Sequence, residues 1–181
     1  MPSHGLGQSL QAWVVPGSLE MRRLGHSLSV GISFGVTSGI ITTVGLLVGL
    51  SAGTNSRAAV LAGIVTIAVA DALSDALGIH ISEENEGVHT SREVWGATAA
   101  TFASKMIMAL TFVIPVLLLP LGTATIVAVV WGALSLTALS FDMGRRQGID
   151  PRPIVLEHLG VATLVVVAAH LLGLAVSALA G

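Results

Sequence analysis

Long apolar stretches separated by short polar segments dominate the chain. A helix needs roughly 20 largely apolar residues to cross a bilayer core about 30 Å thick. Stretches of at least that length cover residues 30–52, 58–81, 94–119, 121–141 and 154–180. Within them, apolar and polar residues do not alternate at every second position, as the strands of a membrane β-barrel would require. The pattern therefore predicts an all-α integral membrane protein with five transmembrane helices.

The composition supports the same class of protein. Of the 181 residues, 53% are hydrophobic and only 10% are charged, against about a quarter charged in soluble domains. The chain has no cysteine, which excludes thiolate metal sites and redox motifs. A net charge of −2 offers no basic face for nucleic acid. We expect a multi-pass protein whose partner is the lipid bilayer, with the cell membrane as the default location because no organellar signal is visible.

The arginines predict how the chain is oriented. If the N-terminus is cytoplasmic, the cytoplasmic segments contain Arg22, Arg23, Arg92, Arg145, Arg146 and Arg152. The opposite side then contains only Arg57. This positive-inside bias predicts a cytoplasmic N-terminus and an external C-terminus. We divide the chain into a cytoplasmic N-terminal extension, residues 1–28, in which Met21 is an alternative start, and a transmembrane domain, residues 29–181.

Glycines recur at every fourth position of the first stretch, in two series. The series are Gly31, Gly35 and Gly39, and then Gly45, Gly49 and Gly53. Small residues at this spacing let another helix approach closely. One GxxxG is explained by packing within the chain, but two series on one helix favour contact with both neighbouring helices and with a second copy. We therefore expect a homodimer formed through these glycine faces.

Two carboxylates stand out inside the second stretch. Asp71 and Asp75 are four residues apart, so they share one face of a helix. Charged groups at membrane depth usually face a cavity or a partner. With Ser74 beside them, they offer oxygen ligands suited to Mg²⁺, Mn²⁺ or Fe²⁺, or they share a proton. The alternative is an ion pair with Lys105 of the third stretch, and the sequence leaves open which aspartate Lys105 pairs with.

An acidic segment follows the second stretch and is expected to form a short cytoplasmic turn over residues 82–93. It contains Glu83, Glu84 and Glu86, with His80, His89 and Glu93 nearby. These side chains could capture a divalent cation before it enters the membrane, although a solvated loop is the commoner role of such a run. No catalytic spacing of serine, histidine and carboxylate, no phosphate loop and no HExxH motif is present, so we do not expect an enzyme.

The first two stretches resemble the vacuolar iron transporter family. The resemblance is carried by FGVTSGIITTVGLLVGLSAG and LAGIVTIAVADALSDALGIHISEE, together with the proline of TFVIPVLLLP and the five-helix count. It extends over residues 31–181, although only the first two helices have distinctive motifs. Members of that family are dimeric exporters of ferrous iron and manganese that are thought to exchange metal for protons. Their ion path lies between the first two helices of each subunit at the dimer axis.

The chain departs from the family motifs at several positions. Ser38 stands where the family usually has aspartate, and Asp75 stands after Ser74 where the family has methionine. Ile79 and His80 replace the family's glutamate and tyrosine. One carboxylate is thus lost from the first helix and one is gained on the second. Replacing a thioether with a carboxylate favours harder ions.

Together these features predict a transporter that exports divalent cations, of the Fe²⁺ or Mn²⁺ class, by proton exchange. Asp71 and Asp75 would bind the ion or carry protons, and Lys105 would balance charge. Ser38, Thr42 and Ser74 would supply neutral oxygens. The transported ion is substrate, and we expect no cofactor. The alternatives are a transporter of the same fold for a non-metal solute, and a membrane assembly protein that transports nothing.

Overall fold

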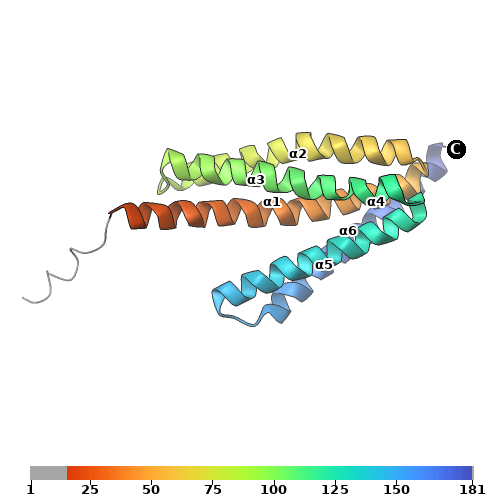
Figure 1. The fold of residues 1–181 in the computed structure, drawn as a ribbon. Coiled ribbons are helices and arrows are strands. Elements are labelled where there is room, and N and C mark those ends of the chain that lie inside the picture. Colours follow the sequence, from red (N-terminus) through yellow and green to blue (C-terminus); the bar gives the residue numbers. More distant parts are fainter. Residues whose placement is uncertain (1–15, 181) are drawn as a thin grey trace, which may run out of the picture.

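The computed structural model describes residues 16–180, which form helices joined by short connections (Figure 1). The helices are α1 (Pro16–Thr54), α2 (Arg57–Glu86), α3 (Ser91–Thr111), α4 (Val113–Leu118), α5 (Leu121–Gln147) and α6 (Pro151–Ala180). Because α3 and α4 together make one crossing segment, five helical segments are long and apolar enough to span a membrane. The predicted five-helix, all-α membrane architecture is confirmed.

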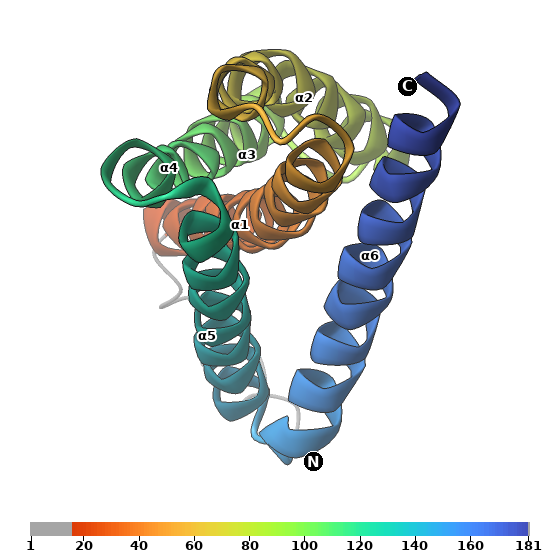
Figure 2. The ribbon, with the colours of Figure 1, turned by 90° about the vertical axis from the view of Figure 1, so that its right-hand side faces the viewer.

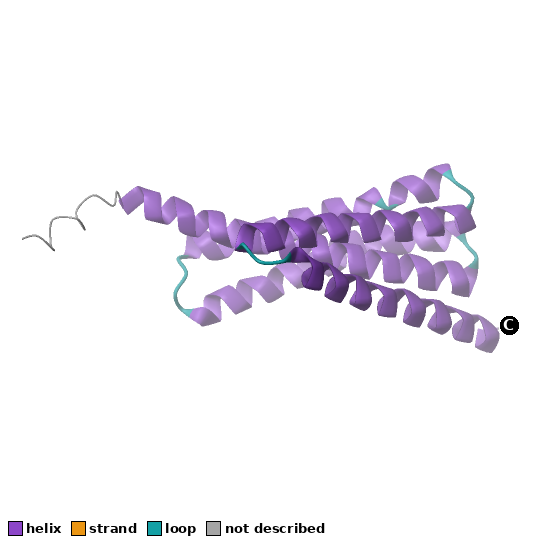
Figure 3. Cartoon of the chain, turned by 90° about the horizontal axis from the view of Figure 1, so that it is seen from below, coloured by secondary structure: helices purple, strands orange, loops and turns teal. Residues whose placement is uncertain are grey.

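α1 is the central helix of the bundle. It contacts α2, α3, α5 and α6, and in Figure 2 it lies between the α2–α3 pair and the α5–α6 pair. The start of α1 and the C-terminus lie at opposite ends of the bundle (Figure 3), as an odd number of crossings requires. We call the end that contains the start of α1 the basic end, because the predicted cytoplasmic arginines lie there. Which side of a membrane it faces stays a prediction.

Two boundaries differ from those expected from hydrophobicity. α1 begins at Pro16, so one helix continues through the expected boundary at residues 28/29; residues 1–15 lie outside the described part. The expected turn over residues 82–93 is largely helical, since α2 continues to Glu86 and α3 begins at Ser91. Local chemistry sets these ends. Gly87 ends α2 at a φ of 66°, and Thr90 and Glu93 form a capping box that starts α3.

The third crossing segment is broken near Pro115. α3 ends at Thr111 and α4 begins at Val113. Pro115 has no N–H to donate to the carbonyl four residues earlier, which is that of Thr111. The break is covered by protein: Phe112 is fully buried, and the indole N–H of Trp131 donates to Thr111 Oγ1 at 3.1 Å.

Both glycine series of α1 are covered by helices of the same chain. Gly31, Gly35 and Gly39 lie against α3, and Gly45, Gly49 and Gly53 lie against α6. A Cβ on Gly35 would collide with Ser104 Oγ and the Thr101 carbonyl. The glycines therefore serve packing within the chain, as the simpler interpretation proposed. Gly31, Gly35, Gly39 and Gly45 are buried by this packing, whereas Gly49 and Gly53 stay partly exposed. The expected contact of the glycine faces with a second copy stays a prediction.

Candidate functional site

The predicted intramembrane charges lie midway along the bundle. Asp71 is 14 residues from the start of α2 and 15 from its end, which is about 21 Å of helix in either direction at ~1.5 Å per residue. Lys105 is 14 residues from the start of the third crossing segment and 13 from its end. Both residues are thus placed close to the middle of a hydrocarbon core about 30 Å thick.

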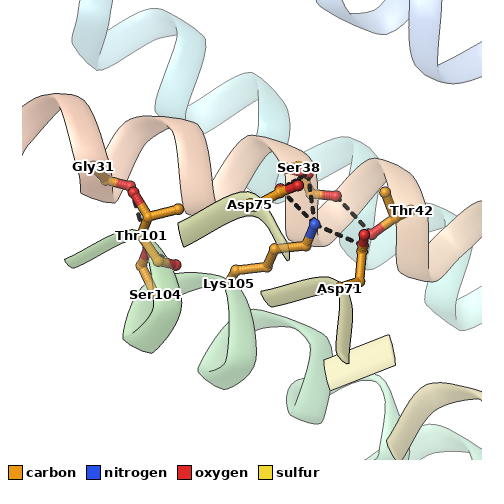
Figure 4. Close-up of polar contacts among 8 residues, drawn as sticks. All are labelled: Gly31, Ser38, Thr42, Asp71, Asp75, Thr101, Ser104 and Lys105. Atoms are coloured by element: carbon orange, nitrogen blue, oxygen red, sulfur yellow. Dashed lines mark hydrogen bonds and ion pairs between the residues drawn. The ribbon is translucent and has the colours of Figure 1, made fainter. Parts of the chain in front are cut away.

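Lys105 contacts both aspartates and a serine from α1 (Figure 4). Its Nζ lies 2.6 Å from Asp71 Oδ2, 2.5 Å from Asp75 Oδ2 and 2.9 Å from Ser38 Oγ. The Ser38 hydroxyl in turn donates to Asp75 Oδ2 at 2.6 Å. We call these four residues the Lys105 cluster. The question of which aspartate Lys105 pairs with is answered: it pairs with both.

The Lys105 ammonium is fully satisfied by these contacts. An ammonium has three N–H donors, and the cluster supplies three acceptors. Lys105 is 1% exposed, whereas the side chain of Asp75 is 20% exposed and that of Asp71 is 33% exposed. With every group ionised, two carboxylates and one ammonium leave a net charge of −1. One further proton or monovalent cation would neutralise it.

Two predicted oxygen donors lie outside the Lys105 cluster. The Thr42 hydroxyl donates to the backbone carbonyl of Ser38 at 2.9 Å, so it supports the α1 backbone beside the cluster. Ser74 is exposed on the outer side of α2. Successive residues turn by about 100° around a helix, and this carries Ser74 outward from its neighbour Asp75. The structure therefore does not bring the Ser74 hydroxyl into the Lys105 cluster.

A second cluster lies at the basic end, where α2 meets α3. Ligand atoms of Glu83, Glu86 and His89 all lie within 4.8 Å of one another. His89 Nε2 is 3.1 Å from Glu86 Oε2 and 3.5 Å from Glu83 Oε2. Glu83 is only 8% exposed, and its Oε2 has no hydrogen-bond partner among the described residues. Two carboxylates and an imidazole suit Zn²⁺, Mn²⁺ or Fe²⁺. We call these residues the His89 cluster.

Two of the expected metal ligands lie apart from the His89 cluster. His80 Nδ1 lies 3.0 Å from Thr98 Oγ1, and its ring packs edge-on against Trp95. The His80 Nε2 is 4.0 Å from Glu84, which is exposed. Of the two histidines that the sequence offers beside the glutamates, His89 and not His80 joins Glu83 and Glu86. The signal for this was Gly87, since a left-handed residue after the helix turns the chain back toward the last turn of α2.

Comparison of the chain with known protein families, with curated proteins and with solved structures gives no match. The resemblance to the vacuolar iron transporter family stays a prediction from the motifs quoted above.

Proposed function

We propose that the protein is a membrane transporter that exports divalent cations of the Fe²⁺ or Mn²⁺ class in exchange for protons. The observation that carries the proposal is the Lys105 cluster, in which two carboxylates and a buried ammonium lie midway along a membrane-spanning bundle. Ionisable groups at this depth are expensive and typically mark ion pathways and proton relays. In a purely structural role, one carboxylate would be enough to pair with Lys105, but the cluster contains two.

The geometry suggests how metal and proton movement would be coupled. The Lys105 ammonium occupies the position between Asp71 and Asp75 that an incoming cation would take. A divalent ion bound by both carboxylates neutralises them, and Lys105 then has no counter-charge. Because an unpaired ammonium is unfavourable in a low-dielectric interior, Lys105 releases its proton when the metal binds. When the metal leaves, the lysine takes up a proton and pairs with the aspartates again.

The His89 cluster is suited to capture the ion before it enters. Glu83 lies eight residues beyond Asp75 on the same helix, which is about 12 Å at ~1.5 Å per residue. A buried carboxylate oxygen without a hydrogen-bond partner among the described residues is available to a cation. The cluster would thus raise the local concentration of metal at the basic end of α2.

A second copy of the chain would cover the outer side of the site. Asp71 is one-third exposed midway along α2, and a carboxylate at that depth is not left facing lipid. Beside it runs an outward-facing row of small residues, which permits close helix contact. The row consists of Ala62, Thr66, Ala70, Ser74, Gly78 and Ser82, all exposed. We therefore move the proposed homodimer contact from the glycines of α1 to this face of α2.

Transport assays in liposomes test the proposal. Purified protein is reconstituted with an internal Mn²⁺-sensitive dye and a pH-sensitive dye, and Mn²⁺ is added outside across a proton gradient. We expect Mn²⁺ entry with opposite proton movement, and loss of both in Asp71→Asn and Asp75→Asn. The matched control is Asp142→Asn, which makes the same chemical change at a half-exposed carboxylate of α5 that pairs with Arg146.

Two results would contradict the proposal. If the folded wild-type protein moves neither Mn²⁺ nor, under anaerobic conditions, Fe²⁺, then a non-metal solute or an assembly role gains support. If both aspartate variants transport as well as Asp142→Asn, the Lys105 cluster is not the exchange site. Ser74→Ala should transport Mn²⁺ as the wild-type protein does, because the Ser74 hydroxyl faces away from the Lys105 cluster.

A further inference from the structure

A tapered groove separates α1 from α5 at the basic end of the bundle. α5 and α6 diverge from α1 toward the start of α1 (Figure 1). A cavity of about 600 Å³ lies in this wedge. Its lining residues lie on one face of α1 between positions 25 and 33 and on one face of α5 between positions 139 and 147, and they do not include Arg145. None of the groups in the two clusters above contributes to it.

The mouth of the groove is polar and basic. His26, Arg146 and Gln147 line it. Arg146 contacts Asp142 through Nε, and its side chain is nevertheless 70% exposed, so its remaining donors are accessible. His26 also borders a neighbouring cavity that Arg22 and Arg23 line. Across the two adjoining cavities, the lining arginines Arg22, Arg23 and Arg146 thus outnumber the one lining carboxylate, that of Asp142.

The inner part of the groove is apolar and continues into the membrane. Leu28, Ile32 and Leu139 line its walls. A second cavity of about 160 Å³, with almost wholly apolar walls, lies deeper, where α1, α5 and α6 converge around Ile40 and Val166. From His26 to Ile40 is 14 residues of α1, about 21 Å at ~1.5 Å per residue. The first cavity ends at Ser33 and the second begins at Ile40, seven residues or about 10 Å further along α1, so the two cavities follow one another along α1 toward the middle of the bilayer.

We propose that this groove binds an anionic phospholipid. The phosphate would lie at Arg146 and His26, and one acyl chain would follow Ile32 and Leu139 toward the deeper cavity. The polar, basic mouth would fit the headgroup of a phospholipid, and the apolar walls below it would fit an acyl chain. Basic pockets between transmembrane helices are known to hold anionic headgroups. A zwitterionic lipid would gain nothing from the surplus of positive charge. The proposal does not depend on what the protein transports.

Native mass spectrometry of the detergent-purified full chain tests the proposal. The probes are phosphatidylglycerol, phosphatidylcholine and free glycerol 3-phosphate, each titrated separately. We expect phosphatidylglycerol to be retained and the other two not. Arg146→Gln should weaken phosphatidylglycerol binding about fivefold, the contribution of one basic side chain near an anionic lipid surface.

The control is Arg145→Gln. Arg145 carries the same charge at the same end of α5, but it lies over the Phe141 ring at 5.9 Å and does not line the cavity. It should leave binding unchanged. Ser33→Phe places a ring in the groove without altering any charge and should abolish retention, with thermal unfolding used to confirm that each variant is folded.

Several outcomes would overturn the proposal. Equal weakening by Arg145→Gln would mean that diffuse charge alone attracts the lipid. Retention of phosphatidylcholine to the same extent would mean that the basic mouth is not selective. If free glycerol 3-phosphate binds as well as the lipid, the groove is a phosphate site only. If folded Ser33→Phe retains phosphatidylglycerol, the lipid lies elsewhere.

Discussion

Replacing Lys105 with methionine removes a charge from the middle of the bundle while keeping most of the side-chain volume. In the native arrangement the ammonium lies within 2.6 Å of both aspartates and is 1% exposed. Without it, Asp71 and Asp75 face each other with no counter-charge. Removing one partner of a buried ion pair typically costs about 3–5 kcal/mol. Because both carboxylates keep some exposure, we expect the lower end, about 3 kcal/mol, for Lys105→Met.

A double-mutant cycle shows whether this cost comes from the ion cluster. If it does, adding Asp75→Asn to Lys105→Met should relieve the repulsion and restore about 1–2 kcal/mol, within the coupling measured for contacting pairs. Combining Lys105→Met with Asp142→Asn should instead be additive, because Asp142 is remote and pairs with Arg146. The assay is the free energy of unfolding in mixed detergent micelles, followed by circular dichroism with increasing denaturing detergent.

The reasoning would be refuted in either of two ways. A cost below about 1 kcal/mol for Lys105→Met would mean that the ammonium contributes little, as exposed ion pairs do. Additivity of Lys105→Met and Asp75→Asn would mean that the two groups do not interact in the folded protein. Either result would remove the structural basis of the proposed exchange site.

Three further substitutions test the packing around the clusters, each by the same unfolding measurement. Gly35→Ala should destabilise the protein by about 1–3 kcal/mol through overpacking against Ser104, whereas Gly160→Ala of α6, with no neighbour of the described chain within 4 Å, should not; equal effects would contradict the close contact of α1 with α3. Thr90→Ala should cost about 1 kcal/mol by removing the capping box of α3, with Thr90→Ser as the control that keeps it. Ser140→Ala should cost about 1–2 kcal/mol, because the buried hydroxyl bonds an imidazole of α6 at 2.7 Å; an unchanged stability would mean that this contact between α5 and α6 does not form.

The fold could be predicted from the sequence because its main cause is local. Each apolar stretch must satisfy its own backbone hydrogen bonds in lipid, so it becomes a helix wherever it lies in the chain. The break at Pro115 has an equally local cause, since proline has no N–H to donate. Helix ends were harder to predict, because the apolar stretch ends at residue 81 whereas α2 continues to Glu86. Gly87 ends α2 and the capping box starts α3, and both are weak sequence signals beside a run of charged residues.

The residues of the two clusters could be predicted from the sequence only in part. A four-residue spacing placed Asp71 and Asp75 on one face of a helix, but spacing says nothing about which helix that face meets. Packing decided that Lys105 bonds both aspartates, and that His89 rather than His80 joins the glutamates. Both outcomes depend on contacts between residues distant in the chain or across a turn.

The class of protein, the number of crossings and the presence of charges at membrane depth could all be predicted without a structure, because they depend on composition and on periodicity along one helix. Helix packing determines that the glycines of α1 face α3 and α6, and that the small residues of α2 face outward. The sequence shows which residues share each face of a helix, but not which face another helix covers. That depends on how the other four segments pack around the limited surface of α1.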